Sequence, residues 1–296
     1  MKRLREFDYH EPTSLDEAVQ ILAKAGGGAR VLAGGTDLVV DMKTGRMRPS
    51  TVVNLKRIPG LSGVEDDAGG TRIGALTKVT AVEASLLVQQ RHPALAQAAS
   101  ILASPPVRAL ATIGGNVGRA SPASDLGPAL IVHEARAAVV GVDGDRDELV
   151  EDLYVGPGAT SLAPSDIITF FTLPQPPPGF GSAHVKLGKR GSGTDIALAG
   201  VSASVVIGDG GEILDCRIAL ASLGPTPFRA FATEAMLRDE MPTEAVLAAV
   251  ATSAAGETKP ISDMRASASY RTTLARVLTL RALRGAVRSA GVEVAV

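Results

Sequence analysis

Apolar residues recur at helical intervals near the start of the chain. The positions that share this three- and four-residue spacing are Leu15, Ala18, Ile21, Leu22 and Ala25. Such spacing predicts a helix with one buried face. Ser14 precedes the pattern and Glu17 follows three residues later, as at a capped helix start. Gly26-Gly27-Gly28 ends the predicted helix, because glycine is a poor helix former.

Apolar runs and helical patterns alternate as far as residue 174. Short apolar runs predict strands at residues 29–33, 51–55, 71–75, 137–142, 148–150 and 166–173. Helical spacing predicts helices at residues 37–44, 78–91, 93–103 and 126–134. Thr80 is the expected N-cap of the second of these helices, and Ser104-Pro105-Pro106 closes the third. The first segment therefore has a βαβ pattern, and a second mixed region begins near residue 60.

A proline-rich stretch, Pro174-Gln175-Pro176-Pro177-Pro178-Gly179, divides the chain. Such a segment forms neither a helix nor a central strand, so it predicts a stiff connector. Alternating patterns beyond it predict antiparallel strands at residues 182–187, 197–207 and 213–221, the last two joined by the turn 208–211. The remainder is predicted to be helical and to end in a long helix over residues 270–290.

The final predicted helix carries five arginines, most of them away from its apolar side. They are Arg271, Arg276, Arg281, Arg284 and Arg288. Two interpretations remain open at this point. The arginines form either a solvated helix face or a surface for a partner protein.

Composition narrows the class of protein. The 296 residues are 45% hydrophobic and 21% charged, which allows two or three domains with a sizeable core. A net charge of −1 gives no basic surface for nucleic acid or anionic lipid. Cys216 is the single cysteine, which excludes an internal disulfide and an iron–sulfur cluster held by this chain alone. We expect no signal peptide and no transmembrane segment, and a cytoplasmic location.

The candidate chemistry lies in two double-glycine motifs that each follow an apolar run. The first is Ala33-Gly34-Gly35-Thr36-Asp37-Leu38 and the second is Thr112-Ile113-Gly114-Gly115-Asn116. Glycine lets the backbone bend freely and approach a ligand closely. Backbone N–H groups at a helix start stabilise a phosphate. We therefore interpret the motifs as two turns that hold one diphosphate, with Asp37 directed at backbone N–H groups or a sugar.

The other polar residues and motifs give weaker signals. Asp125 ends the hydroxyl-rich loop that follows the second motif, and it is either a helix cap or a partner for a ribose hydroxyl or adenine amino group. Lys186, Lys189 and Arg190 cluster after a predicted strand, where surface charge is the default interpretation. No Gly-x-Gly-x-x-Gly follows a strand and no Walker motif occurs, which excludes the Rossmann and P-loop sites.

The sequence contains no motif that indicates hydrolysis or metal binding. The four histidines, His10, His92, His133 and His184, are scattered without the spacing of metal ligands. No serine lies in a nucleophile elbow. A bound cofactor would therefore have to supply any redox chemistry.

The two motifs, their separation and the three-part layout resemble the FAD-binding medium subunits of molybdenum hydroxylases, the family of xanthine dehydrogenase and aerobic carbon monoxide dehydrogenase. The resemblance also includes the opening Phe7-Asp8-Tyr9-His10-Glu11-Pro12 and the segment Ser104-Pro105-Pro106-Val107-Arg108. It extends to the closing helix, from Tyr270 to Leu283, and so covers essentially the whole chain.

The resemblance implies an α+β fold. A two-part FAD-binding domain of the PCMH/vanillyl-alcohol-oxidase type, a small βαβ piece plus a larger α/β piece, would precede a C-terminal α+β domain with an antiparallel sheet and helices. The implied boundaries are residues 1–57, 58–175 and 176–296. FAD would lie between the first two parts.

The resemblance also implies the cofactor-binding residues. These are Val31, Leu32, Ala33, Gly34, Gly35, Thr36, Asp37, Leu38, Leu102, Ala103, Thr112, Gly114, Gly115, Asn116, Asp125, Thr169 and Lys186. The glycine motifs would hold the diphosphate from its two sides. Leu102 and Ala103 would lie near the flavin, Thr169 near its ring system, and Lys186 would reach the flavin side.

The implied function is electron transfer. Substrate would be hydroxylated at a molybdopterin centre in a large subunit, and electrons would pass through two [2Fe-2S] clusters in a small subunit to FAD and then to an external acceptor. A dimer of heterotrimers is the implied assembly. An autonomous FAD-dependent oxidase or reductase of the same fold is the alternative, and an assembly subunit that has lost FAD is a third hypothesis.

Two departures from family patterns bear on the substrate. One cysteine argues against the benzoyl-CoA-reducing branch, which carries an extra cluster in this subunit. The first motif reads Gly-Gly-Thr-Asp, whereas carbon monoxide dehydrogenases tend toward Gly-Gly-His-Ser. That difference favours a hydroxylase of an aromatic heterocycle, ketone or aldehyde.

Overall fold

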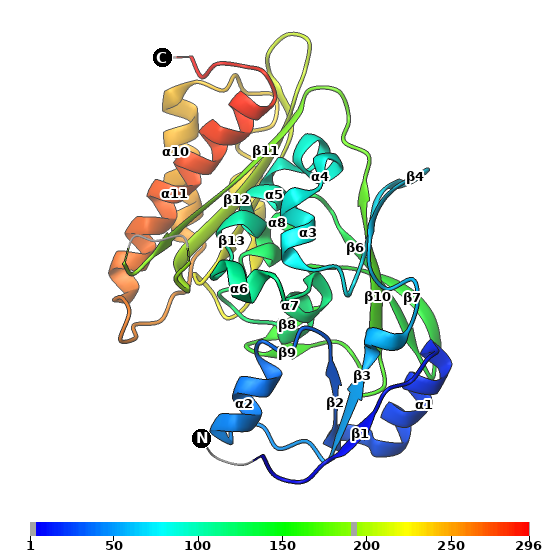
Figure 1. The fold of residues 1–296 in the computed structure, drawn as a ribbon. Helices are drawn as coiled ribbons and strands as arrows, with labels where there is room; N and C mark the ends of the chain where they lie inside the picture. Colours follow the sequence, from blue (N-terminus) through cyan, green and yellow to red (C-terminus); the bar gives the residue numbers. More distant parts are fainter. Residues whose placement is uncertain (1–3, 191–193, 296) are drawn as a thin grey trace.

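The computed structural model describes residues 4–190 and 194–295 (Figure 1). Its helices are α1 (Leu15–Ala25), α2 (Leu38–Thr44), α3 (Val79–Ala84), α4 (Leu86–Arg91), α5 (Pro93–Ile101), α6 (Pro105–Arg108), α7 (Ile113–Arg119), α8 (Leu126–Val132), α9 (Phe231–Glu234), α10 (Glu244–Gly256) and α11 (Ala268–Ser289). Within the described residues no helix combines the length and the apolar character needed to cross a membrane.

A small parallel sheet forms the N-terminal part of the molecule. Its strands are β1 (Asp8–His10), β3 (Thr51–Asn54) and β2 (Ala29–Leu32), in that order. The predicted capped helix is confirmed as α1, where the Ser14 hydroxyl accepts a hydrogen bond from the Glu17 N–H at 3.2 Å. The apolar face of α1 packs with Val53 and with Ile167 of the next sheet, which joins this part to the rest of the molecule.

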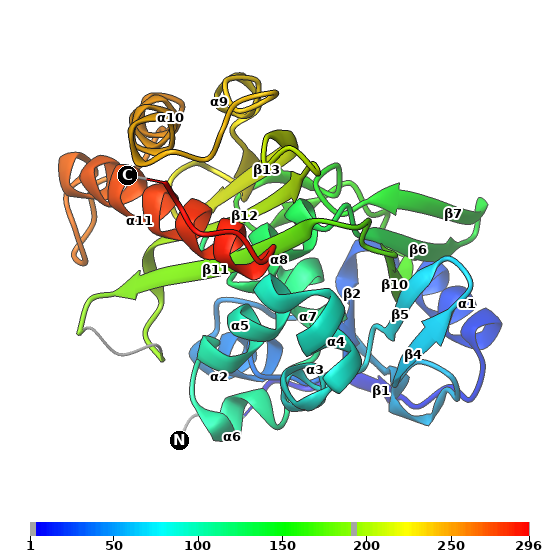
Figure 2. The same ribbon diagram turned by 90° about the horizontal axis from the view of Figure 1, so that it is seen from above.

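A five-stranded antiparallel sheet lies beside a group of helices at the centre of the molecule (Figures 1 and 2). The strand order is β4 (Val64–Asp67), β5 (Gly70–Gly74), β10 (Ile167–Pro174), β6 (Arg136–Gly141) and β7 (Gly144–Leu149). Helices α3 to α8 share one buried core with this sheet. A short pair, β8 (Tyr154–Gly156) and β9 (Ala159–Thr160), completes the region.

The C-terminal part is an antiparallel sheet covered by helices α10 and α11 (Figures 1 and 2). Its strands are β11 (Phe180–Gly188), β12 (Ala197–Ile207), β13 (Ile213–Ala221) and β14 (Phe228–Arg229). The three predicted antiparallel strands and the hairpin at residues 208–211 are confirmed. The connector also behaves as predicted, since β10 ends at Pro174 and β11 begins at Phe180.

The predicted helix over residues 78–91 is wrong in one respect. The backbone of Ser85 is extended, with φ −70° and ψ 118°, and divides the segment into α3 and α4. The Ser85 hydroxyl then accepts a hydrogen bond from the Val88 N–H and caps α4. Thr80 is therefore not a cap, and α3 begins after Lys78 instead. Serine favours such a local side-chain bond over a continuous helix.

The segment 104–108 also differs from the prediction. The helix α5 already ends at Ile101, before Ser104-Pro105-Pro106, and the two prolines occupy the first turn of a further short helix, α6. Proline fits there because the first N–H groups of a helix have no internal partner, so its missing N–H costs nothing. The strand β4 was likewise not predicted, since three of its four residues are acidic.

Two buried histidines join the central and C-terminal parts. His92 Nδ1 lies 3.2 Å from His133 Nδ1, and His92 Nε2 lies 2.9 Å from the hydroxyl of Thr71 on β5. His133 Nε2 lies 3.2 Å from the hydroxyl of Ser182 on β11. Burial lowers the pKa of His92 to about 4 and holds that of His133 well below its usual value, so both rings are neutral near pH 7.

The contact between α11 and β11 generates a stability prediction. A Cβ atom at Gly181 would lie 2.3 Å from both the carbonyl oxygen of Ala286 and the backbone nitrogen of Ala290. Gly181→Ala should therefore force the helix away and lower the free energy of unfolding by about 1–3 kcal/mol. Urea denaturation of the purified chain measures this change.

Gly256→Ala is the matched control for that variant. Gly256 is the last residue of α10, and a Cβ atom there would meet nothing within 4 Å. The control should leave the free energy of unfolding unchanged or raise it by up to about 1 kcal/mol. Equal stability of Gly181→Ala and the wild type would contradict the packing described here.

Candidate functional site

The structure brings the two glycine motifs into direct contact. A Cβ atom at Gly34 would lie 2.2 Å from the carbonyl oxygen of Leu110 and 2.9 Å from the Cα of Ala111. A Cβ atom at Gly115 would lie 3.9 Å from that of Ala33. The motifs are therefore neighbours, although they are far apart in the sequence. Only a residue without a side chain fits at Gly34.

The first motif is a true turn with free donors. Gly35 has φ +74°, a conformation that glycine adopts without strain. Throughout residues 4–190 and 194–295, no acceptor receives a hydrogen bond from the backbone N–H of Gly34, Gly35, Thr36 or Asp37. These consecutive donors precede α2, whose positive dipole end adds to their attraction for an anion. The turn can therefore hold a phosphate through its backbone.

The second motif is not a turn, and this part of the prediction is wrong. Gly114 and Gly115 lie in the first turn of α7, and the hydroxyl of Thr112 caps the helix by accepting from Gly115 N–H at 3.1 Å. The N–H of Gly114 donates to the carbonyl oxygen of Ala75 at 2.9 Å. The N–H of Ile113 likewise donates to the carbonyl oxygen of Thr77 at 3.1 Å.

The second motif instead offers a bare backbone surface and one amide side chain. Gly115 is exposed at the helix start, where a ligand can approach closely. Asn116 Oδ1 accepts a hydrogen bond from the Ser124 hydroxyl at 2.6 Å. This contact leaves the Asn116 amide hydrogens as donors. The two motifs can therefore bind a ligand in different ways. The first offers backbone N–H groups, and the second offers an exposed backbone without a side chain and the amide of Asn116.

Ion pairs join the helices that follow the two motifs. Arg119, at the end of α7, lies 3.1 Å from the buried carboxylate of Asp41 on α2 and 3.8 Å from that of Asp37. Arg46 binds the other oxygen of Asp41 at 2.7 Å. Asp37 makes no capping hydrogen bond, so the first of its two predicted roles, a contact with backbone N–H groups, is wrong, and a contact with a sugar stays a prediction. Sequence reasoning missed Asp41 and Arg119, because their pairing depends on the fold.

Asp125 and Lys186 form a buried ion pair at 2.7 Å. The capping interpretation of Asp125 is wrong, since the Ser124 hydroxyl accepts from the N–H of Gly127 instead. Burial raises the pKa of Asp125 to about 6, although the Lys186 ammonium opposes that rise. Asp125 Oδ1 is buried and has no hydrogen-bond partner among the described residues.

The backbone at Leu102 and Ala103 is held by two cations. Arg108 Nη1 donates to the carbonyl oxygens of Leu102 and Ala103 at 3.1 and 3.0 Å. Lys186 Nζ donates to that of Ile101 at 2.9 Å. Ala103 has φ +44°, a strained value for alanine that these contacts maintain. The chain therefore leaves α5 in one fixed direction.

Thr169 lies behind the second motif. Its buried hydroxyl donates to the carbonyl oxygen of Ala138 at 3.1 Å, at a bulge in β10. Its carbonyl oxygen accepts from the N–H of Ala75, whose own carbonyl oxygen accepts from Gly114. Thr169 is thus linked to the second motif through Ala75. Val31, Leu32 and Leu38 are half-buried in or beside the first motif.

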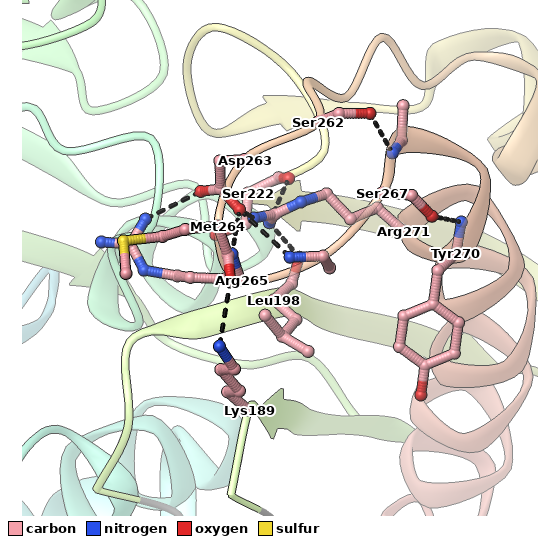
Figure 3. Close-up of polar contacts among 12 residues, drawn as sticks. Lys189, Leu198, Ser222, Ser262, Asp263, Met264, Arg265, Ser267, Tyr270 and Arg271 are labelled. Atoms are coloured by element: carbon pink, nitrogen blue, oxygen red, sulfur yellow. Dashed lines mark hydrogen bonds and ion pairs between the residues drawn. The ribbon is translucent and has the colours of Figure 1, made fainter.

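The remaining basic residues lie elsewhere. Lys189 Nζ donates to the carbonyl oxygen of Met264 (Figure 3). Arg190 pairs with Asp195. Arg271 is buried, not solvated, and it binds Asp263 at 2.9 Å and the carbonyl oxygen of Leu198 at 2.6 Å (Figure 3). Three other arginines of α11 line a surface cavity of about 500 Å³, and these are Arg281, Arg284 and Arg288.

The side chains that could ligate a metal ion are dispersed in the described part of the chain. Among residues 4–190 and 194–295, no three His, Cys, Asp or Glu side chains gather in a way that could hold a metal ion. Three of the four histidines are buried, as His92, His133 and His184, while His10 is exposed. The lone thiol of Cys216 is also buried, which raises its pKa well above the usual value.

Comparison with known protein families gives two matches along the chain. Residues 5–176 match the family described as "FAD binding domain in molybdopterin dehydrogenase". Residues 183–286 match the family described as "CO dehydrogenase flavoprotein C-terminal domain". The two matched segments meet at the proline-rich connector.

Individual relatives match over nearly their full length. The carbon monoxide dehydrogenase medium chain of Hydrogenophaga pseudoflava is 34% identical, over 95% of this chain and 96% of its own. The xanthine dehydrogenase FAD-binding subunit of Escherichia coli O157:H7 is 31% identical, over 96% of this chain and 97% of its own length. A solved structure of the Hydrogenophaga carbon monoxide dehydrogenase aligns with a TM-score of 0.93 and 33% identity, covering 97% of this chain and 99% of that one.

The buried ion pair generates a prediction about pH. Lys186→Met should lower the free energy of unfolding by about 3–5 kcal/mol near neutral pH, because it leaves the Asp125 carboxylate buried without its partner. The pKa of Asp125 is already raised to about 6, and loss of the ammonium raises it further. An Asp with a raised folded pKa favours folding below its unfolded pKa, and this contribution is lost as the pH rises.

The variant should therefore lose less stability at pH 5 than at pH 8, as measured by denaturation at the two values. Lys189→Met removes an exposed lysine three residues away and serves as the control. Its expected change is below about 0.5 kcal/mol at both pH values. A loss in Lys186→Met that is independent of pH would contradict the buried pairing.

Proposed function

The chain belongs to the FAD-binding medium subunits of the molybdenum hydroxylases, and from this premise we propose that it relays electrons from the iron–sulfur clusters of a partner subunit through FAD to an external acceptor. It is an oxidoreductase subunit. The observation that carries the proposed site is the run of free N–H groups from Gly34 to Asp37 beside the bare backbone at Gly115.

The residues present fit FAD on three observations. The free N–H groups of the first motif suit a diphosphate, which is a dianion. Gly115 is exposed and has no side chain, so the α7 start can approach a ligand closely. Asp125 Oδ1 is a buried acceptor without a partner, which suits a hydroxyl or amino group of a bound nucleotide.

We assign the parts of the site accordingly. Gly34, Gly35, Thr36 and Asp37 hold the diphosphate through their N–H groups, while Thr112, Gly114, Gly115 and Asn116 face it from the other side. The half-buried apolar residues Val31, Leu32, Ala33 and Leu38 line the cofactor. Leu102, Ala103, Thr169 and the Asp125–Lys186 pair border the flavin or ribose. FAD supplies the redox chemistry, and the protein binds and orients it.

The proposed assembly contains a large subunit with the molybdenum cofactor and a small subunit with two [2Fe-2S] clusters, as a dimer of heterotrimers. Support comes from relatives that are named as a medium chain and as an FAD-binding subunit of a dehydrogenase. We also propose a cytoplasmic location. The three-part division at residues 1–57, 58–175 and 176–296 is supported by the three larger sheets, one of which lies in each part.

The substrate stays a prediction from the first motif. Relatives named for carbon monoxide and for xanthine match this chain at 34% and 31% identity, so their names do not select one substrate. An aromatic heterocycle, ketone or aldehyde remains our expectation. The substrate pocket belongs to the large subunit of the proposed complex.

The diphosphate site generates a matched pair of variants. Gly115→Val places a branched side chain on the exposed backbone that faces the first motif, so FAD affinity should fall at least tenfold. Its Cβ atom also comes within 2.9 Å of the capping Thr112 hydroxyl, which must shift, so the thermal stability of the apo variant is measured beside its affinity. Gly118→Val makes the same change one turn along α7, where a Cβ atom meets nothing within 4 Å. The control should keep its FAD. Flavin released on denaturation and titration of the apo chain with FAD measure both variants.

Two results would overturn the proposed site. Full FAD binding by Gly115→Val would exclude the α7 start as its second side. Equal loss in both variants would show that the helix, rather than the diphosphate contact, is sensitive. Circular dichroism of the apo chains confirms that each variant is folded before FAD is added.

The electron-transfer role is tested with the assembled complex. Substrate should bleach the flavin absorbance only when the molybdenum and iron–sulfur subunits are present. Bleaching of the isolated chain by a substrate would favour the autonomous oxidase or reductase instead. A complex that contains no flavin would contradict both functions.

A further inference from the structure

The first glycine motif places a carboxylate beside the proposed diphosphate site. Asp37 follows Gly34-Gly35-Thr36 directly, and its side chain is 62% exposed beside the free N–H groups. A carboxylate there repels a diphosphate bound at the same turn. Asp41, one turn later on α2, adds a second negative charge.

Arginine side chains balance these charges. Arg119 reaches across from α7 and lies between the two carboxylates, 3.8 Å from Asp37 and 3.1 Å from Asp41. Arg46 contacts only Asp41, on its other oxygen at 2.7 Å. Among the ion pairs of residues 4–190 and 194–295, Arg119 is thus the single partner of Asp37.

We propose that Arg119 is a positioning residue for FAD, which offsets the charge of Asp37 so that the first motif accepts a diphosphate. The inference rests on the proposed FAD site. It adds a residue outside both glycine motifs, and it explains how an aspartate is tolerated next to a dianion. The mechanism is electrostatic, so removing the carboxylate should make the arginine dispensable.

The folded chain should survive loss of Arg119. Asp41 keeps Arg46 as its partner, so no buried carboxylate is left unpaired. The Arg119 side chain is 39% exposed, and its removal opens no core cavity. Arg119→Gln is therefore a suitable test variant, and Arg119→Lys keeps the positive charge.

The test is titration of the apo full-length chain with FAD at low and high salt. Arg119→Gln should weaken FAD binding about fivefold to tenfold at low salt, the size of one uncompensated charge a few ångströms from the ligand. The loss should shrink at high salt, which screens exposed charges. Arg119→Lys should stay within about threefold of the wild type, because it keeps the charge.

Two further variants separate charge from structure. Adding Asp37→Asn to Arg119→Gln should restore most of the affinity, since the uncompensated carboxylate is gone. Arg46→Gln removes an arginine from the same buried Asp41 but not from Asp37, and its FAD affinity should change less than twofold. Thermal unfolding of the apo chains shows whether any variant is misfolded.

Each outcome decides one question. Wild-type affinity in Arg119→Gln, or no rescue by Asp37→Asn, would overturn the role of Arg119 while leaving the FAD site in place. An equal loss in Arg46→Gln would assign the effect to Asp41 and net charge instead. Failure of the wild-type chain to bind FAD under all conditions would overturn the proposed function itself.

Discussion

The site depends on one close approach between two backbones. Gly34 lies against the carbonyl oxygen of Leu110 at a distance that no Cβ atom allows, since one would come within 2.2 Å. This contact fixes the first turn beside α7, and every other feature of the site is arranged around it. The parallel strand β2 delivers one backbone, and the short helices α6 and α7 deliver the other. A cofactor bound there would therefore touch two segments that lie far apart in the sequence.

The elements of the fold were largely predictable, because hydrophobic periodicity is a local signal. The capped helix α1, the hairpin between β12 and β13, and the proline-rich connector all follow from neighbouring residues. Failures occurred where a polar side chain competed with the pattern. Ser85 divides one predicted helix into two, because its hydroxyl caps the second. The acidic strand β4 carries too little apolar signal to be recognised.

The sequence predicted which residues form the candidate site, but not the contacts between them. Both glycine motifs were found, but the sequence could not show that the N–H groups of α7 are already bonded to Ala75 and Thr77. Those bonds join residues from different elements, and no spacing along the chain encodes them. The same limit applies to Lys186, whose ammonium meets a carboxylate 61 residues earlier, and to the pairing of Asp41 with Arg119. Charge partners of this kind follow from topology rather than from motifs.

The row of buried hydrogen bonds through His92 and His133 can run in either of two directions. Because both rings are neutral, a hydrogen bond between the two Nδ1 atoms requires one ring to donate and the other to accept. If Ser182 donates to His133, then His133 donates to His92 and His92 to Thr71; if Thr71 donates, every bond runs the other way. The row therefore has two self-consistent directions and no mixed one. The tautomers of two imidazoles at the ends of different helices are thus coupled, and a change of direction on β5 is transmitted to β11 without any movement of the backbone.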